Sequence, residues 1–265
     1  MSGKALLAVV VLSGIYLLFI HVAVPKRGPN APASRNAPAP SDPILRGNEK
    51  KKFLAEVERD MKRAAILPQG LSLSISDCKE TNAYYYHDRK IVLCYGLVDE
   101  MYGHFFREYR SVNEAKQATR RAASFIMFHE LGHALVNTSD IALTAGEEPS
   151  VDQLAFFLLT RDDQSRKGEE AIIEAANFFF KVANAGETSA GDAHGFHQQR
   201  AFNLTCWLFG QGKDFSHIKA SLPPDRAATC KGEYDQLEKS WGKVLTSHRL
   251  LSVSTKPGGL QAKAR

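Results

Sequence analysis

His129 and His133 lie four residues apart in the stretch from Asn113 to Asn137, whose apolar spacing predicts a long helix that begins near Ser111 or Asn113. This spacing places both imidazole rings on one face of the helix, about one turn apart. A helix exposed to water would not carry the apolar residues that surround the pair. These are Ile126, Met127, Phe128, Leu131, Ala134, Leu135 and Val136. The pattern predicts a buried helix that points two imidazoles in one direction, rather than two surface histidines.

The pair belongs to the pentapeptide His129-Glu130-Leu131-Gly132-His133, which matches the pattern H-E-x-x-H. Two imidazoles one helical turn apart can share a zinc ion. A bound zinc lowers the pKa of water toward about 7, and the glutamate between the histidines can take up the water's proton. The motif therefore predicts zinc ligands at His129 and His133. It also predicts that Glu130 is the general base for hydrolysis by zinc-activated water.

A catalytic zinc needs a third protein ligand and an open position for water. Glu148 and Asp152 lie in the next predicted helix, Glu148 to Thr160, and face the same way because they are four residues apart. We expect Glu148 to bind the zinc, and Asp152 to accept a hydrogen bond from the other ring nitrogen of a zinc-binding histidine. Glu147 and Asp152 are the alternative ligands. Acidic residues in a first helical turn also complement the helix dipole without any metal.

A second polar cluster, from Asp192 to Arg200, opens a later predicted helix, Phe196 to Phe209. Polar donors of this kind can stabilise the oxyanion that forms when water attacks a peptide carbonyl. We expect His194 to take this catalytic role, with His197 and Arg200 as the alternatives. A single histidine is also typical of a helix cap or of a packed core, so the assignment depends on the motif context.

The first 25 residues differ from the rest of the chain. The run from Ala5 to Val24 is almost unbroken in its apolar character, and about 20 helical residues suffice to cross a membrane. This pattern predicts that residues 1–25 form an uncleaved signal anchor, which is a transmembrane helix. The alternative is a cleaved signal peptide, which would release a secreted protein. Residues 26–44 are rich in Pro and Ala and predict a disordered linker. The folded domain is expected at 45–250, and a disordered tail at 251–265.

The four cysteines are even in number and lack C-x-x-C spacing, which argues against a zinc ribbon. Cys78 and Cys94 flank a predicted hairpin, while Cys206 and Cys230 flank a turn that contains prolines. We expect the disulfides Cys78–Cys94 and Cys206–Cys230; four buried free thiols are the alternative. Disulfides persist outside the cytoplasm, so the catalytic domain is predicted to be membrane-anchored in the periplasm or the extracellular space.

The chain has 265 residues, 44% of them hydrophobic, and can bury a full core. Its net charge of +5 is spread along the chain without a nucleic-acid-binding motif, so no nucleic-acid partner is expected. The patterns predict strands at 71–76, 83–86 and 90–95. They also predict helices at 49–65, 169–183 and 234–246.

Several separate stretches, taken in order, resemble the DUF4344 family, described as putative metallopeptidases. They are TNAYYYHDRKIVLCYGLV, HELGHALV, GEEPSVDQLA, DAHGFHQQRAFNLTCWLFG and the segment from Cys230 to Trp241. The resemblance covers about residues 48 to 245. It implies a zinc peptidase site at His129, Glu130, His133 and Glu148, and a lipoprotein or secreted location. The pair Glu148 and Asp152 is also similar to the third-ligand helix of thermolysin-like gluzincins.

Together these observations predict an α+β, zincin-like fold. A small, mainly antiparallel sheet, from about Leu71 to Leu97, would pack on the active-site helix, followed by a mostly helical C-terminal half and preceded by one transmembrane helix. The predicted function is a zinc-dependent metallopeptidase that hydrolyses peptide bonds of peptide or protein substrates. An exposed sheet edge beside the cleft would bind an extended peptide. The alternative is a membrane-tethered binding or scaffolding module that keeps zinc for stability and has no turnover.

Overall fold

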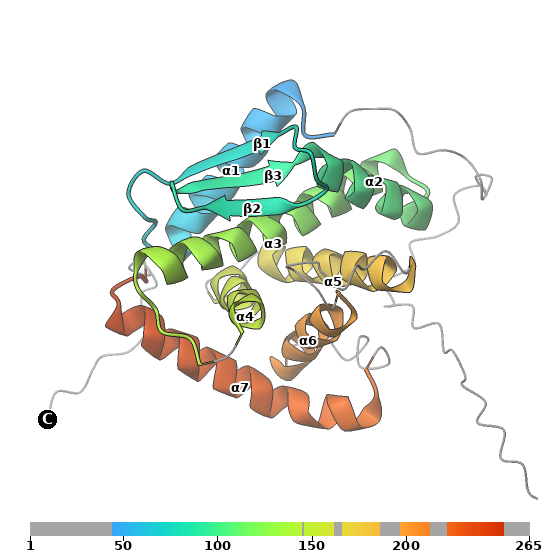
Figure 1. Cartoon of the computed structure of the whole chain (residues 1–265). Helices are drawn as coiled ribbons and strands as arrows, with labels where there is room; N and C mark the ends of the chain where they lie inside the picture. Colours follow the sequence, from blue (N-terminus) through green and yellow to red (C-terminus); the bar gives the residue numbers. More distant parts are fainter. Residues whose placement is uncertain (1–43, 145, 162–165, 186–196, 213–221, 252–265) are drawn as a thin grey trace, which may run out of the picture.

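The structure, a computed structural model, describes residues 44–144, 146–161, 166–185, 197–212 and 222–251. Within these residues the chain forms three strands and seven helices (Figure 1). The strands are β1 (Ser72–Ser76), β2 (Ala83–Tyr86) and β3 (Lys90–Cys94). The helices are α1 (Gly47–Ala64), α2 (Tyr95–Tyr109), α3 (Val112–Thr138), α4 (Glu147–Thr160), α5 (Lys167–Ala185), α6 (His197–Gly210) and α7 (Pro224–Ser247). The predicted α+β class with a small sheet and a mostly helical remainder is confirmed.

The sheet has the strand order β1-β3-β2, in which β3 pairs in parallel with β1 and antiparallel with β2. The prediction of a mainly antiparallel sheet is therefore wrong for one of the two strand pairs. A short turn joins Tyr86 to Lys90 and makes β2 and β3 antiparallel. After Ser76 the chain reverses direction and forms β2 at the far edge of the sheet. Strand β3 then lies between β1 and β2. Because β3 reverses β2, it runs in the same direction as β1.

Helix α3 is the centre of the domain. The hydroxyl of Ser111 caps it by accepting a hydrogen bond from the backbone N–H of Glu114, as the sequence predicts. The sheet packs along one side of α3, where the Tyr85 hydroxyl donates to Asn137 Oδ1 over 3.1 Å, while α4 and α5 lie against other sides (Figure 1). Phe125 and Phe128 of α3 are fully buried. With packing on so many sides, α3 holds its residues in fixed positions.

Both predicted disulfides are present. Cys78–Cys94 joins the loop after β1 to the last residue of β3. Cys206–Cys230 joins α6 to α7, and both of its sulfurs belong to fully buried residues. The alternative of four free thiols is thereby excluded for this structure.

Two helices differ from the sequence prediction. Helix α2 was not predicted, because the β-rich pattern through Leu97 led directly into its first turn, although apolar residues recur at helical spacing at Val98, Met101 and Phe105. Helix α7 begins at Pro224 rather than at Tyr234. Its prolines suggested a turn, whereas Pro224 occupies a first-turn position that has no need of a backbone N–H.

Several predicted segments lie outside the described residues: the membrane helix at 1–25, residues 26–43 of the linker, residues 252–265 of the tail, and His194. At the described ends, Ile44 is fully buried and Leu251 forms a bridge with Ala65. Both residues therefore belong to the packed part of the chain. In the part of the chain that the structure describes, no helix combines the length and the apolar character needed to cross a membrane.

Candidate metal centre

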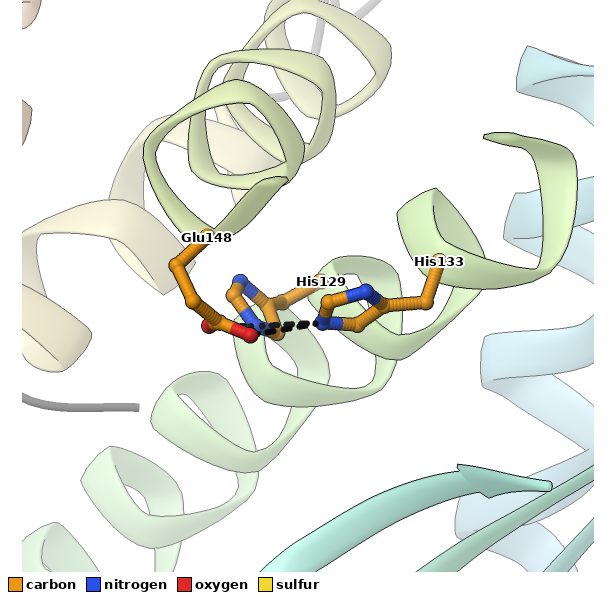
Figure 2. Close-up of side chains that lie close together, drawn as sticks. All are labelled: His129, His133 and Glu148. Carbon is orange, nitrogen blue, oxygen red and sulfur yellow. Dashed lines mark hydrogen bonds and ion pairs between the residues drawn. The ribbon is translucent and has the colours of Figure 1, made fainter. Parts of the chain in front are cut away.

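The two motif histidines and Glu148 converge where α3 meets the start of α4 (Figure 2). The Nε2 atoms of His129 and His133 lie 3.3 Å apart. Glu148 directs one carboxylate oxygen to each ring, at 3.1 Å from His129 Nε2 and 3.3 Å from His133 Nε2. One donor atom from each residue thus lies within 4.8 Å of the others. Among the described residues, this is the one such grouping of His, Cys, Asp and Glu.

The separations between these atoms fit a tetrahedral metal. Zinc ligands about 2.0 to 2.1 Å from the ion, at tetrahedral angles, lie about 3.3 to 3.4 Å from one another. The two nitrogens lie 3.3 Å apart, close to that value, and each lies 3.1 to 3.3 Å from a different oxygen of Glu148. Two imidazole nitrogens and one carboxylate are also a donor set typical of a catalytic zinc site. The residues present therefore fit a zinc ion.

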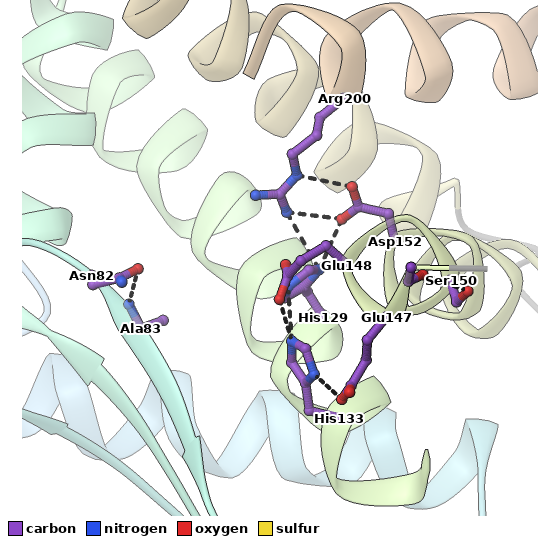
Figure 3. Close-up of polar contacts among 10 residues, drawn as sticks. Asn82, Ala83, His129, His133, Glu147, Glu148, Ser150, Asp152 and Arg200 are labelled. Atoms are coloured by element: carbon purple, nitrogen blue, oxygen red, sulfur yellow. Dashed lines mark hydrogen bonds and ion pairs between the residues drawn. The ribbon is translucent and has the colours of Figure 1, made fainter. Parts of the chain in front are cut away.

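The local sequence explains why α4 delivers its acidic side chains to α3. Gly146 precedes the helix, and Glu147 and Glu148 occupy its first turn, where negative charge complements the helix dipole. Asp152 follows Glu148 by one turn and faces the same side. Glu147, Glu148 and Asp152 therefore meet the two histidines as a group (Figure 3).

His129 is held by a buried carboxylate. Its Nδ1 lies 2.8 Å from Asp152 Oδ1, and both side chains are almost completely buried. An Nδ1–H that donates to Asp152 leaves Nε2 facing Glu148 and the candidate metal position. Asp152 thus lies at the ring nitrogen of His129 that faces away from Glu148.

Arg200 forms a two-point contact with the same carboxylate. Its Nε donates to Asp152 Oδ2 and its Nη2 to Oδ1, each over 2.8 Å. Burial alone would raise the pKa of Asp152, but Arg200 and His129 lower it to about 2. For His129, burial and Arg200 oppose protonation, yet the contacts with Asp152 and Glu148 outweigh them and raise its pKa to about 9. Asp152 is therefore a permanently ionised acceptor.

His133 is held by a different carboxylate. Its Nδ1 lies 2.7 Å from Glu147 Oε1, and the Glu147 side chain is 53% exposed. Glu147 was considered in the sequence only as an alternative ligand. The structure instead places it behind the ring of His133, away from the point where the Nε2 atoms meet. Two consecutive acids at a helix start are the sequence signal for this arrangement, because only one of them can face the metal.

Glu130 and the residues of α6 complete the surroundings. Glu130 follows His129 on α3 and is 2% exposed, and its charge acts on both His133 and Arg200. His197 opens α6 and stacks on the Phe179 ring, with ring centroids 5.6 Å apart. Arg200, proposed in the sequence as an oxyanion donor, has two of its guanidinium nitrogens directed at Asp152 instead. The sequence did not predict that contact, because 48 residues separate the two partners.

The comparison with protein-family models agrees with a metal site. The model of DUF4344, described as "Putative metallopeptidase", matches residues 41–245, which is 205 of the 265 residues. The matched region contains both histidines, Glu148 and Asp152. No curated protein and no solved structure matches the chain.

Proposed function

The chain belongs to DUF4344 on that match, and we propose that it is a zinc-dependent peptidase with His129, His133 and Glu148 as its zinc ligands. The convergence of two Nε2 atoms and one carboxylate at tetrahedral spacing carries this proposal. Among the described residues, the group that could hold a metal has three members and no fourth, which favours a catalytic site over a closed structural one.

A zinc ion bound by these residues would polarise a peptide carbonyl and lower the pKa of water toward about 7. Glu130 would accept a proton from the attacking water and return it to the leaving amine. Asp152 and Glu147 would keep the two imidazoles in the tautomer that presents Nε2. Arg200 would hold Asp152 in place rather than contact the substrate. His194 stays our candidate for stabilising the oxyanion.

The edge of the sheet supports a peptide as substrate. Strand β2 is an outer strand, and it packs against α3. The backbone carbonyl of Asn82 accepts from Cys94 N–H over 3.0 Å, so the N–H and carbonyl of Ala83 point away from β3. The same alternation turns the backbone groups of Tyr85 outward. The Ala83 N–H donates to Asn82 Oδ1 over 2.9 Å (Figure 3), so an extended peptide would pair by strand addition with the other outward-facing backbone groups of β2.

We also propose that the domain works outside the cytoplasm, tethered to a membrane by residues 1–25. Two disulfides support an oxidising compartment. The apolar run from Ala5 to Val24 supports a spanning helix. Detection of intact residues 1–25 in membrane fractions of the native host would support the tether. Recovery of a shortened chain from the medium would instead indicate a secreted enzyme.

The decisive test compares the parent protein with Glu130→Gln. The purified parent should hold one zinc per chain and cleave peptides in a proteome-derived library. Glu130→Gln should keep zinc and fold but lose about two to four orders of magnitude in activity, because the group that accepts the water's proton is gone. The His129→Ala, His133→Ala double variant should lose stoichiometric zinc. Undiminished cleavage by Glu130→Gln would refute the mechanism even if zinc were bound.

A further inference from the structure

Helices α3 and α4 approach each other closely at a glycine. A Cβ atom added to Gly132 would lie 2.8 Å from Val151 Cβ, 3.2 Å from its Cγ1 and 3.3 Å from its Cα. The nearest of these atoms is fixed to the backbone, so no rotation of the Val151 side chain relieves the contact. Val151 is fully buried and has no open space into which to move. Only a residue without a side chain allows the two backbones to come this close.

This close contact lies inside the candidate metal centre. Gly132 is the residue between His129 and His133 that faces α4, and Val151 lies between Glu148 and Asp152. The contact therefore sets the distance between the helix that carries the imidazoles and the helix that carries the carboxylates. Any increase in that distance moves Glu147, Glu148 and Asp152 together.

We propose that Gly132 is a positioning residue for the metal, because its missing side chain sets the helix spacing at which Glu148 completes the ligand set. This inference rests on the proposed zinc site. The proposal gives a role to the second x of H-E-x-x-H, the position directly before His133. Gly132 itself touches neither metal nor substrate.

The required displacement is large compared with the tolerance of a metal site. Ordinary contacts begin at 3.4 Å, so an added Cβ needs a separation of about 0.6 Å to reach one from its present 2.8 Å. Metal–ligand distances tolerate about 0.2 Å. The Glu148 side chain could extend to follow the shift, but Asp152 is held at 2.8 Å from both His129 and Arg200 and would lose one of these contacts.

The first experiment measures zinc affinity of the full chain by competition with a chelator. Gly132→Ala should weaken zinc binding by about 100-fold or more, beyond the 10- to 100-fold range for a lost outer hydrogen bond. Gly232→Ala is the matched control, since an added Cβ at this exposed α7 position meets no atom within 4 Å. Its affinity should stay within about twofold of the parent. Equal affinity of Gly132→Ala and the parent would overturn the proposal.

The second experiment moves the glycine to the other helix. In Gly132→Ala, Val151→Gly the Cβ and Cγ1 atoms of residue 151 are gone, and the closest remaining contact is the Cα at 3.3 Å. This variant should bind zinc within about tenfold of the parent, a comparison that holds even if Gly132→Ala alone proves too unstable to purify. A folded double variant, checked by circular dichroism, whose zinc affinity stays about 100-fold or more below that of the parent would overturn the proposal. Failure of the parent itself to bind zinc would instead remove the metal site and this role with it.

Discussion

The two histidines of the candidate metal centre have the same type of partner in opposite surroundings. His129 Nδ1 contacts Asp152, which is buried and bound by Arg200 at both oxygens. His133 Nδ1 contacts Glu147 at a similar distance, but that carboxylate is half exposed. The same hydrogen bond is therefore strong and permanent on one side and screened by water on the other. The difference indicates that the site is anchored through His129 and adjustable through His133.

The anchor extends beyond the carboxylate. The guanidinium of Arg200 also lies over the Phe179 ring of α5, 4.2 Å from its centroid. Arg200 belongs to α6 and Asp152 to α4, so the contact joins three helices behind His129. Glu147 has no comparable support, since it lies at the first residue of α4. Helix starts open more readily than helix interiors.

The largest effect is expected from removing the guanidinium. Arg200→Met leaves Asp152 buried with only His129 as a counter-charge, and breaking a buried ion pair costs about 3–5 kcal/mol. Denaturant unfolding of the metal-free protein measures this loss. Arg200→Lys keeps the charge but not the two-point contact, so its stability should lie between that of the parent and that of Arg200→Met. A loss below about 1 kcal/mol for Arg200→Met would show that Arg200 does not anchor the site.

A buried carboxylate without such a contact sharpens the comparison. Glu174 is 6% exposed, and burial raises its pKa to about 7, although Tyr109 donates to it over 2.9 Å and Arg121 lies nearby. A folded-state pKa above the unfolded value of 4.5 favours the protonated form of Glu174. The contribution of Glu174 to stability is therefore fully present below pH 4.5 and is lost as the pH rises through about 7.

Replacing Glu174 by Gln removes that titration. Glu174→Gln should unfold with the same free energy as the parent near pH 4.5 but be more stable by roughly 2–3 kcal/mol at pH 8. Thermal unfolding across this pH range provides the measurement. If the variant were less stable than the parent at pH 8, the ionised carboxylate would be stabilising there, and the contrast with Asp152 would not hold.

At the anchored histidine, the smaller change Asp152→Asn keeps the shape and removes the charge. Zinc affinity should fall by about 10- to 100-fold, because the amide orients His129 less firmly and makes its ring a weaker donor to the metal. Chelator competition at constant pH gives the value. An unchanged affinity would mean that orientation of His129 depends on packing alone.

At the adjustable histidine, the equivalent change should matter least. Glu147→Gln is expected to lower zinc affinity by less than about tenfold, since water already screens the Glu147 contact with His133. The loss should shrink further at about 1 M salt, whereas that of Asp152→Asn should not. A loss equal to that of Asp152→Asn at both salt concentrations would remove the distinction between the two sides.

The sequence predicted the parts of the site that depend on local spacing. His129 and His133 share a face because they are one turn apart, and Glu148 and Asp152 do so for the same reason. The position of each pair within its own helix follows from helical geometry alone. Both disulfide pairings followed from cysteines that flank short predicted segments.

What the sequence did not predict depends on how distant elements pack. The contact of Arg200 with Asp152 joins α6 to α4, and the close approach of Gly132 to Val151 joins α3 to α4. Neither leaves a periodic pattern in the chain. The strand order likewise depends on β3 entering between β1 and β2, which the alternation of side chains cannot reveal.

The Cys78–Cys94 disulfide has a consequence for the survival of the chain in the presence of peptidases. Exposed loop tips are the usual sites of proteolytic nicking, because a cleaved segment has to adopt an extended form within the attacking enzyme. Residues 77–81 are exposed and lead into β2. The disulfide ties this loop near its start, and the hydrogen bond from Cys94 N–H to the Asn82 carbonyl ties its end. The disulfide and this hydrogen bond thereby restrain the loop and make it a poor substrate for peptidases.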